Sequence, residues 1–168
     1  IISEIKQRRM RIIICALFFA VVGCKSTQNK GSVNELKEFD FQTISTGSLF
    51  GDGLEGISES NFTITNGKAW NALKNNMNKE NNISSNFKEM SIDFSTEMIV
   101  CVFDKVRSTG GISVEIDKIF IENDSTKINY SIKKPAPGEM AVTVVAQPYH
   151  IVKTQKSKGV LFFIHTEK

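Results

Sequence analysis

The chain has 168 residues, with 21 Lys and Arg against 18 Asp and Glu and a formal net charge of +3. The surplus lies in residues 1–23, which hold four basic residues and one acidic residue, so the other 145 residues carry 17 of each kind. This balance, without a cluster of Lys and Arg among aromatic residues, excludes a nucleic-acid-binding protein that works by charge. A chain of 145 residues suits one domain with a sizeable core.

The N-terminal region carries a basic segment and a short apolar run. Arginines at positions 8, 9 and 11 precede residues 12–22, an unbroken apolar stretch that ends in Gly23 and Cys24. The stretch is shorter than the roughly 20 residues of a membrane-spanning helix and matches the apolar core of a secretory signal. Its end resembles the signal of bacterial lipoproteins, which are cleaved before the cysteine and acylated on it. We therefore expect a signal peptide over residues 1–23 and a lipid on Cys24, with a plain cleaved signal as the alternative.

Around this signal the chain divides into three parts. Residues 1–9 precede Met10 and are either an upstream extension or outside the translated protein. Residues 24–42 are polar, which predicts a flexible tether between the lipid and a single domain over residues 43–168. No acidic residue directly follows the cysteine, which resembles lipoproteins of the outer membrane. The expected location is the bacterial cell envelope, lipid-anchored at the outer membrane and facing the periplasm.

The domain begins with a period-two alternation of apolar residues, which is typical of strands. Residues 44–49 and 57–64 predict a first hairpin around the glycine-rich segment 51–53. Residues 98–103 are apolar on both alternations, which predicts a strand in the middle of a sheet, covered by a helix on one side and by chain on the other.

One amphipathic helix follows the predicted hairpin. Asn66 is a good N-cap, because its side-chain oxygen can accept from the free amides of a first helical turn. Trp70, Leu73 and Met77 recur at helical spacing and form one apolar stripe. We expect this stripe to pack in the core rather than to bind a ligand.

Further strands complete the domain. The apolar parity of residues 112–116 switches at residues 119–121, which predicts a β-bulge near Asp117 and Lys118. Residues 135–138 form a loop by their proline and glycine content. The remaining alternating segments are residues 128–132, 142–145 and 160–164, the last again apolar on both faces. The predicted fold class is α+β, a mainly antiparallel β-sheet meander with one amphipathic helix packed on it.

Few residues offer catalytic chemistry. His150 lies at a predicted bend over residues 148–150 and His165 in the last strand, and neither has a second histidine or cysteine at metal-ligand spacing. Cys101 is the one cysteine beyond Cys24, within the most apolar strand, where a thiol is usually inert. No nucleophile or phosphate-binding motif occurs. We expect no catalytic residues, no metal and no cofactor.

A loop at residues 107–111 is the strongest candidate for recognition. Arg107 and Thr109 offer exposed donors before Gly110 and Gly111, on a loop between two strands. We expect this loop to lie beside Pro148 and Tyr149 at one end of the sheet and to bind a protein. The alternative is that Arg107 pairs with an acid such as Glu97 or Asp93 and fixes the turn, and that Tyr149 packs inward.

These motifs occur in an order that can be compared with known families. They are Trp70, Asp93-Phe94-Ser95 with Glu97-Met98, Arg107-x-Thr109-Gly110-Gly111-x-x-Val114-x-Ile116 and Pro148-Tyr149-x-Ile151-Val152. Over about residues 68–154 this order resembles the C-terminal domain of the PrcB family, named for a lipoprotein subunit of a surface protease complex. The chain departs from the family at Ile112, where the family often has tyrosine.

The resemblance implies a non-catalytic, membrane-anchored accessory protein that binds and stabilises a protein partner, with a secreted or surface protease as the implied partner. One alternative is a protease inhibitor that uses a rigid Thr-Gly-Gly loop. Another is a lipoprotein that binds a small molecule or a glycan, which would need exposed aromatic residues. The residues quoted above do not separate these three functions.

Overall fold

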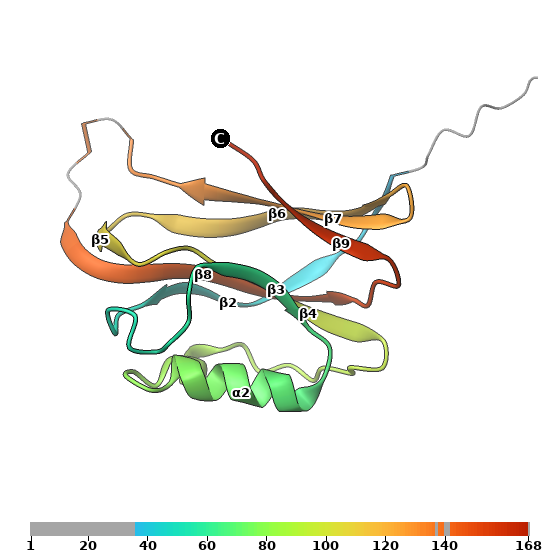
Figure 1. The fold of residues 1–168 in the computed structure, drawn as a ribbon, viewed down its shortest axis with the longest axis horizontal. Helices are drawn as coiled ribbons and strands as arrows, with labels where there is room; N and C mark the ends of the chain where they lie inside the picture. The colour runs from blue at the N-terminus through green and yellow to red at the C-terminus, as the bar shows by residue number, and fades with distance from the viewer. Residues whose placement is uncertain (1–35, 137, 140–141, 168) are drawn as a thin grey trace, which may run out of the picture. The chain divides into compact units, whose positions relative to one another are not determined.

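The computed structural model describes residues 36–136, 138–139 and 142–167, all within one structural unit of residues 34–168 (Figure 1). The predicted signal peptide, Cys24 and the tether up to residue 35 lie outside the described residues. No helix in the described ranges is both long and apolar enough to cross a membrane. The elements in chain order are β1 (Lys37–Glu38), β2 (Phe41–Leu49), β3 (Ser60–Ile64), α2 (Gly67–Met77), a 3-10 helix (Ile83–Asn86), β4 (Glu97–Phe103), β5 (Arg107–Thr109), β6 (Ser113–Glu122), β7 (Ser125–Lys133), β8 (Thr143–Gln155) and β9 (Val160–His165).

The strands form two sheets, and α2 covers one of them (Figure 1). The outer sheet has the order β1-β6-β7-β9, and the central sheet has the order β2-β8-β4-β3, with β5 also paired to β8. One apolar cluster fills the space between the two sheets, and a second lies between the central sheet and α2. All pairs are antiparallel except β7 with β9. The α+β class with one α-helix on antiparallel sheet is therefore confirmed.

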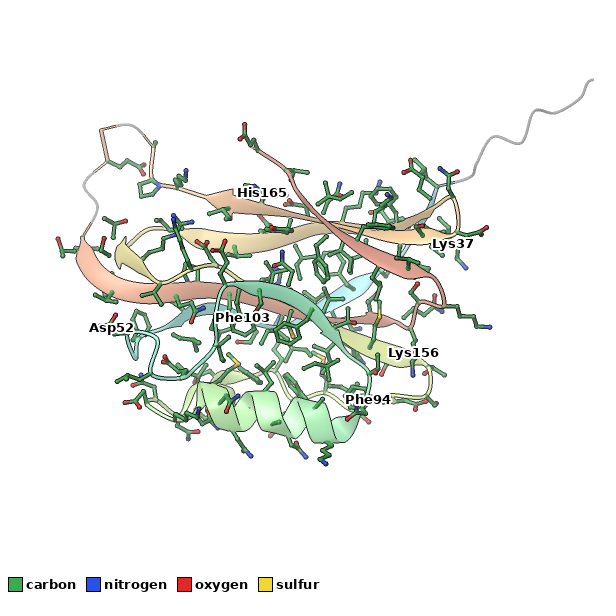
Figure 2. All side chains as sticks on the ribbon, viewed as in Figure 1. Lys37, Asp52, Phe94, Phe103, Lys156 and His165 are labelled. Carbon is green, nitrogen blue, oxygen red and sulfur yellow. The ribbon has the colours of Figure 1, made fainter. Side chains whose placement is uncertain are left out.

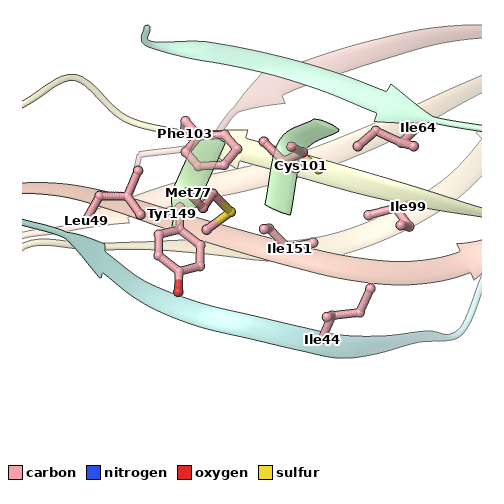
Figure 3. Packing of buried hydrophobic residues seen from close by; sticks show 10 residues of the cluster. Ile44, Leu49, Ile64, Met77, Ile99, Cys101, Phe103, Tyr149 and Ile151 are labelled. Atoms are coloured by element: carbon pink, nitrogen blue, oxygen red, sulfur yellow. The ribbon is translucent and has the colours of Figure 1, made fainter. Parts of the chain in front are cut away.

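β4 lies between the two clusters, as its two apolar faces predict. Ile99, Cys101 and Phe103 face the α2 side, where Figure 3 shows them with Tyr149 and Met77. The alternate residues Met98, Val100 and Val102 belong to the cluster between the sheets. The position of β4 in the middle of a sheet is therefore confirmed.

α2 begins and packs as its sequence predicts. The side chain of Asn66 accepts a hydrogen bond from the Ala69 amide at 2.9 Å, which satisfies one of the free donors of the first turn. Leu73 and Met77 are buried against the central sheet. Trp70 is only half-buried, and its ring stacks on Phe87 with 5.6 Å between centroids. The helix stripe is thus a core element whose first residue lies at the rim.

The predicted β-bulge is present in β6. Ile116 pairs with Tyr130 and Lys118 pairs with Asn129, so Asp117 is the extra residue. Ser131 donates a hydrogen bond to the Asp117 carboxylate at 3.2 Å, and Thr166 does so at 3.3 Å. The insertion keeps Ile116 and Ile119 on the same buried face.

Two expectations about strand pairing were wrong. Residues 44–49 and 57–64 do not form a hairpin, because β2 pairs with β8 and β3 pairs with β4 on the opposite edge of the central sheet. The strand order is accordingly not a simple meander. Local alternation identifies a strand but carries no information on its partner, so these pairings could not be read from the sequence.

The predicted tether ends earlier than residue 42. β1 pairs with β6, the Phe39 amide donates to the Ile119 carbonyl at 2.8 Å, and Phe39 is buried between the sheets. β2 then begins at Phe41. The short polar segment around Phe39 gave too little apolar pattern to predict a strand, yet one ring is enough to fix it on the core.

Candidate protein-binding surface

The first part of the candidate site lies where β4 passes into β5. Both strands pair with β8, β4 over Tyr149 to Gln155 and β5 over Thr143 to Ala146, so the chain between them interrupts one continuous edge. Asp104 lies at this interruption with a fully buried side chain, and it accepts two hydrogen bonds from Arg107 at 2.7 and 2.8 Å. This bidentate contact raises the pKa of the guanidinium.

The Arg107 pair therefore matches the alternative of a turn-fixing ion pair, although the acid is Asp104 rather than Glu97 or Asp93. The Arg107 side chain keeps 20% of its surface exposed. Arg107 thus has a structural task and is still partly open to solvent, beside the exposed Lys105 and Val106.

Gln147 connects this junction to a second segment. Its side-chain amide donates to the carbonyl oxygens of Asp104 and Ile57, each at 2.9 Å. The Asp104 amide in turn donates to the carbonyl of Pro148 at 2.9 Å. These bonds hold the start of β8, the β4–β5 junction and the end of the loop that follows β2 together.

The predicted bend at residues 148–150 is absent. Pro148 lies within β8, a continuous strand of 13 residues, and is buried. In an antiparallel strand the nitrogen and the carbonyl of one residue point to the same side, so the Pro148 nitrogen faces the interrupted edge. The proline fits there because no residue of β4 or β5 pairs with Pro148, so the strand needs no backbone N–H donor at this position.

Tyr149 is a core residue and not part of an exposed surface. Its side chain is 3% exposed, its ring lies 5.7 Å from that of Phe103, and its hydroxyl is 3.0 Å from the Ser45 hydroxyl on β2 (Figure 3). Burial raises the pKa of Tyr149, and the Ser45 hydrogen bond partly opposes this. The expectation that Tyr149 would contact a partner was wrong.

The space beside the two glycines after Thr109 is filled by other residues of the same chain. Gly110 is buried, and a Cβ atom there would lie 3.0 Å from Val144 and 3.1 Å from Val142. Gly111 has φ +77°, and a Cβ atom there would lie 2.8 Å from Pro135. Thr109 itself is exposed in β5. The Thr-Gly-Gly segment is therefore a packed strand end, with Thr109 as its exposed side chain.

Exposed apolar side chains lie at the same end of the unit as this junction, and sequence reasoning missed them. Leu54 is 66% exposed and Phe50 56%, and both belong to the loop after β2 that the Gly51 amide closes on the buried Glu55 carboxylate at 2.9 Å. Val106 lies against Gly53, which joins this loop to the β4–β5 junction. We call the set of exposed apolar residues at this end the loop-end surface; it consists of Phe50, Leu54, Val106, Val142 and Val145.

The loop-end surface lies at one end of the unit. Figure 2 shows Asp52, within the same loop, at the opposite end from Lys37 and Lys156. The register agrees, because Arg107 pairs with Ala146 near the start of β8, whereas Lys37 and Gln155 line a cleft at its other end. The signal in the sequence was the pair Phe50 and Leu54 among three glycines, since loops rich in glycine run over the surface.

The other residues with chemical potential have structural surroundings. Burial raises the pKa of Cys101, so its thiol is protonated at neutral pH. The Nδ1 atom of His150 accepts a hydrogen bond from the Ile116 amide at 2.8 Å, and its Nε2 atom lies 3.0 Å from the Thr43 hydroxyl. A neutral imidazole ring thus links the two sheets. Burial lowers the pKa of His150, although the nearby carboxylates of Glu115 and Asp117 act to raise this pKa.

Of the described side chains, no three His, Cys, Asp or Glu come together as a metal site. The tryptophan and the two tyrosines offer little open surface, because Tyr149 is buried, Trp70 stacks on Phe87 and Tyr130 stacks on His165 at 5.3 Å.

Comparison with known proteins identifies the segment that carries the junction. Residues 98–155 match the family model described as PrcB C-terminal. This segment, about a third of the chain, is similar to the PrcB C-terminal family. The resemblance drawn from Arg107 to Gly111 and Pro148 to Val152 is confirmed there, whereas Trp70 and Asp93 lie outside the matched residues. No curated protein and no solved structure matches the chain.

The PrcB C-terminal segment begins and ends with paired strands. It runs from the start of β4 through β5, β6 and β7 to the end of β8, so it supplies strands to both sheets. Four strands outside the segment, β1, β2, β3 and β9, complete the two sheets, and α2, also outside it, covers the central sheet. The family motifs Arg107 and Pro148 meet at Asp104, which makes the junction the structural centre of the segment.

Proposed function

We propose that the chain is a non-catalytic accessory lipoprotein whose PrcB-like domain binds and stabilises a protein partner at the cell envelope. The observation that carries the proposal is the loop-end surface, because a group of exposed apolar residues on a soluble domain marks an interaction site. Arg107 adds an arginine held at a fixed position beside that surface, and arginine is among the residues that dominate binding energy in interfaces.

The family supports a protease as this partner. The PrcB family takes its name from a lipoprotein subunit of a surface protease complex, and the matched segment holds the Arg107 junction, Val106 and all of β8.

Anchoring and binding would use opposite ends of the domain. Lys37, the first residue of β1, lies at the end opposite the loop-end surface (Figure 2). A lipid on Cys24 would therefore leave that surface free to meet a partner in the periplasm. Cys24→Ser should move the protein from the detergent phase to the aqueous phase in phase partitioning, since lipid chains supply firm membrane attachment. Partitioning of the wild-type protein into the aqueous phase would contradict the anchor.

Capture of the partner tests the binding surface. The tagged full-length protein is recovered from its own membranes, and the proteins that come with it are quantified by mass spectrometry. Phe50→Ser and Leu54→Asp should each reduce the amount of captured partner at least ten-fold, because they place polar atoms where an apolar contact is needed. Both side chains are largely exposed, so the melting temperature should change little.

Leu36→Asp is the matched control, because Leu36 is also an exposed apolar residue, at 54%, but lies next to β1 at the other end. It should retain the partner at the wild-type level. Equal capture by Leu54→Asp, Phe50→Ser and the wild type would reject the loop-end surface. If the captured partner had no peptidase activity, the proposal that the partner is a protease would be rejected.

A further inference from the structure

β9 has the sequence of a covered strand but lies at the edge of the outer sheet. Its only strand partner in the described structure is β7. Leu161 and Phe163 pack toward the space between the sheets, while Val160, Phe162 and Ile164 point away, with 63%, 45% and 37% of their surface exposed. The two apolar faces of residues 160–164 resemble those of β4, but β9 has one of these faces open to solvent.

The other three sheet edges are protected in the usual ways. β1 has two residues, Lys37 and Glu38, both charged. β2 carries a register shift at Ile44 and four hydroxyl side chains, and β3 begins with polar Ser60 and Asn61. Short, charged, polar or bulged edges prevent pairing with another chain. β9 has none of these devices over its first five residues, which are all apolar.

We propose that β9 pairs antiparallel with β9 of a second copy of this chain, with Phe162 on the two-fold axis. In this register Phe162 lies opposite Phe162 of the second copy, and Val160 lies opposite Ile164. Leu161 lies opposite Phe163 on the other face. Residues directly opposite each other in an antiparallel pair point to the same face, so each face of the pair joins apolar side chains only. The two outer sheets become one continuous sheet.

The charges at the ends of β9 favour the antiparallel arrangement. Lys156 and Lys158 precede the strand, whereas Glu167 and Lys168, which have opposite charges, follow it. Antiparallel pairing keeps the basic ends of the two copies apart, whereas parallel pairing would place them side by side. Lys127 lies over the Phe162 ring at 4.4 Å from the neighbouring strand and covers only part of the apolar surface.

Disulfide cross-linking of the full-length protein in its membranes tests both the pairing and its register. Phe162→Cys should give a disulfide-linked dimer on a non-reducing gel after mild oxidation, because opposite residues of an antiparallel pair bring their Cα atoms to about 4.5–5.5 Å. Val160→Cys alone should not, since the register separates it from its own copy by four residues, or about 13 Å. Val160→Cys mixed with Ile164→Cys should again give the dimer.

The wild-type chain measures the background from Cys15, Cys24 and Cys101, and circular dichroism checks that each variant folds. Two results would overturn the proposal. One is a folded Phe162→Cys protein that stays monomeric under oxidation or cross-links no better than Val160→Cys. The other is a Phe162→Cys protein that cross-links only to a protein of different mass, which would assign the edge to a strand from a different partner.

Discussion

Tyr149 has a ring that fills the α2-side core and a hydroxyl that needs a partner there. Tyr149→Ala should lower the free energy of unfolding by about 3–5 kcal/mol, the range for the loss of a large buried ring. Tyr149→Phe should cost about 1–3 kcal/mol, because it leaves the buried Ser45 hydroxyl without its partner. Denaturant unfolding of the three proteins measures both values. Unchanged stability of Tyr149→Ala would contradict its place in the core.

His150 should make stability depend on pH. Its folded-state pKa lies below the ordinary value of about 6.5, so below that pH the unfolded chain takes up a proton that the folded protein excludes. The free energy of unfolding should therefore fall as the pH drops from 7.5 to 5.5. The acidic groups with lowered pKa, Asp93 and Glu97, titrate below this window.

Replacement of each histidine separates the two possible sources of this pH dependence. His150→Gln should flatten the loss of stability between pH 7.5 and 5.5, measured by denaturant unfolding at each pH. His165→Gln is the control, because His165 is exposed at the end of β9. A slope that persists in His150→Gln and disappears in His165→Gln would reverse the assignment.

At the scale of elements, the glycines of the Thr-Gly-Gly segment serve packing. Gly111→Ala should cost about 1–2 kcal/mol for the left-handed backbone and about 1–3 kcal/mol more for the overlap with Pro135. Gly138 is the matched control, since its φ is +92° but a Cβ atom there would meet nothing within 4 Å. Thermal unfolding should therefore rank Gly111→Ala below Gly138→Ala, and equal melting temperatures would rule out the Pro135 contact.

Elements with a strong local pattern were predictable, and their pairings were not. Asn66 and the stripe to Met77 gave the helix, and the parity switch at Asp117 gave the bulge, because both depend on near neighbours in sequence. The long strand β8 was divided at Pro148, because a proline usually ends a strand. Pro148 can lie within β8 because the pairing along that edge is interrupted at Asp104, a residue 44 positions away in sequence.

The candidate site was predicted in part for the same reason. Arg107 was predicted on a loop with Glu97 or Asp93 as its acid, whereas it begins the short strand β5 and its acid is Asp104, only three positions away. Tyr149 lies in a segment that is apolar at almost every position, so the alternation of apolar residues did not predict on which face of the strand its ring would lie. The exposure of Leu54 depends on how the loop after β2 closes on Glu55, which no periodicity reports.

At the scale of the whole molecule, the position of Phe39 sets where the folded domain begins. Phe39→Ala should lower the free energy of unfolding by about 3–5 kcal/mol, since the ring is buried between the two sheets. Leu36→Ala should have little effect because Leu36 is exposed. Urea unfolding of both variants measures the difference. Equal stability of the two variants would restore the tether boundary at residue 42.

The position of β8 has a consequence for how the protein reaches its native state. β2 and β4 pair with β8 on either side, so the central sheet has no middle until residues 143–155 are present. Partners such as Phe41 and Thr154 lie far apart along the chain, and contacts of this kind form slowly. A chain emerging from a ribosome or a translocation channel could pair β3 with β4 early, but β2 and the other edge of β4 would stay unpaired until residues 143–155 had followed. Its early strands therefore depend on a chaperone or on speed for protection from aggregation.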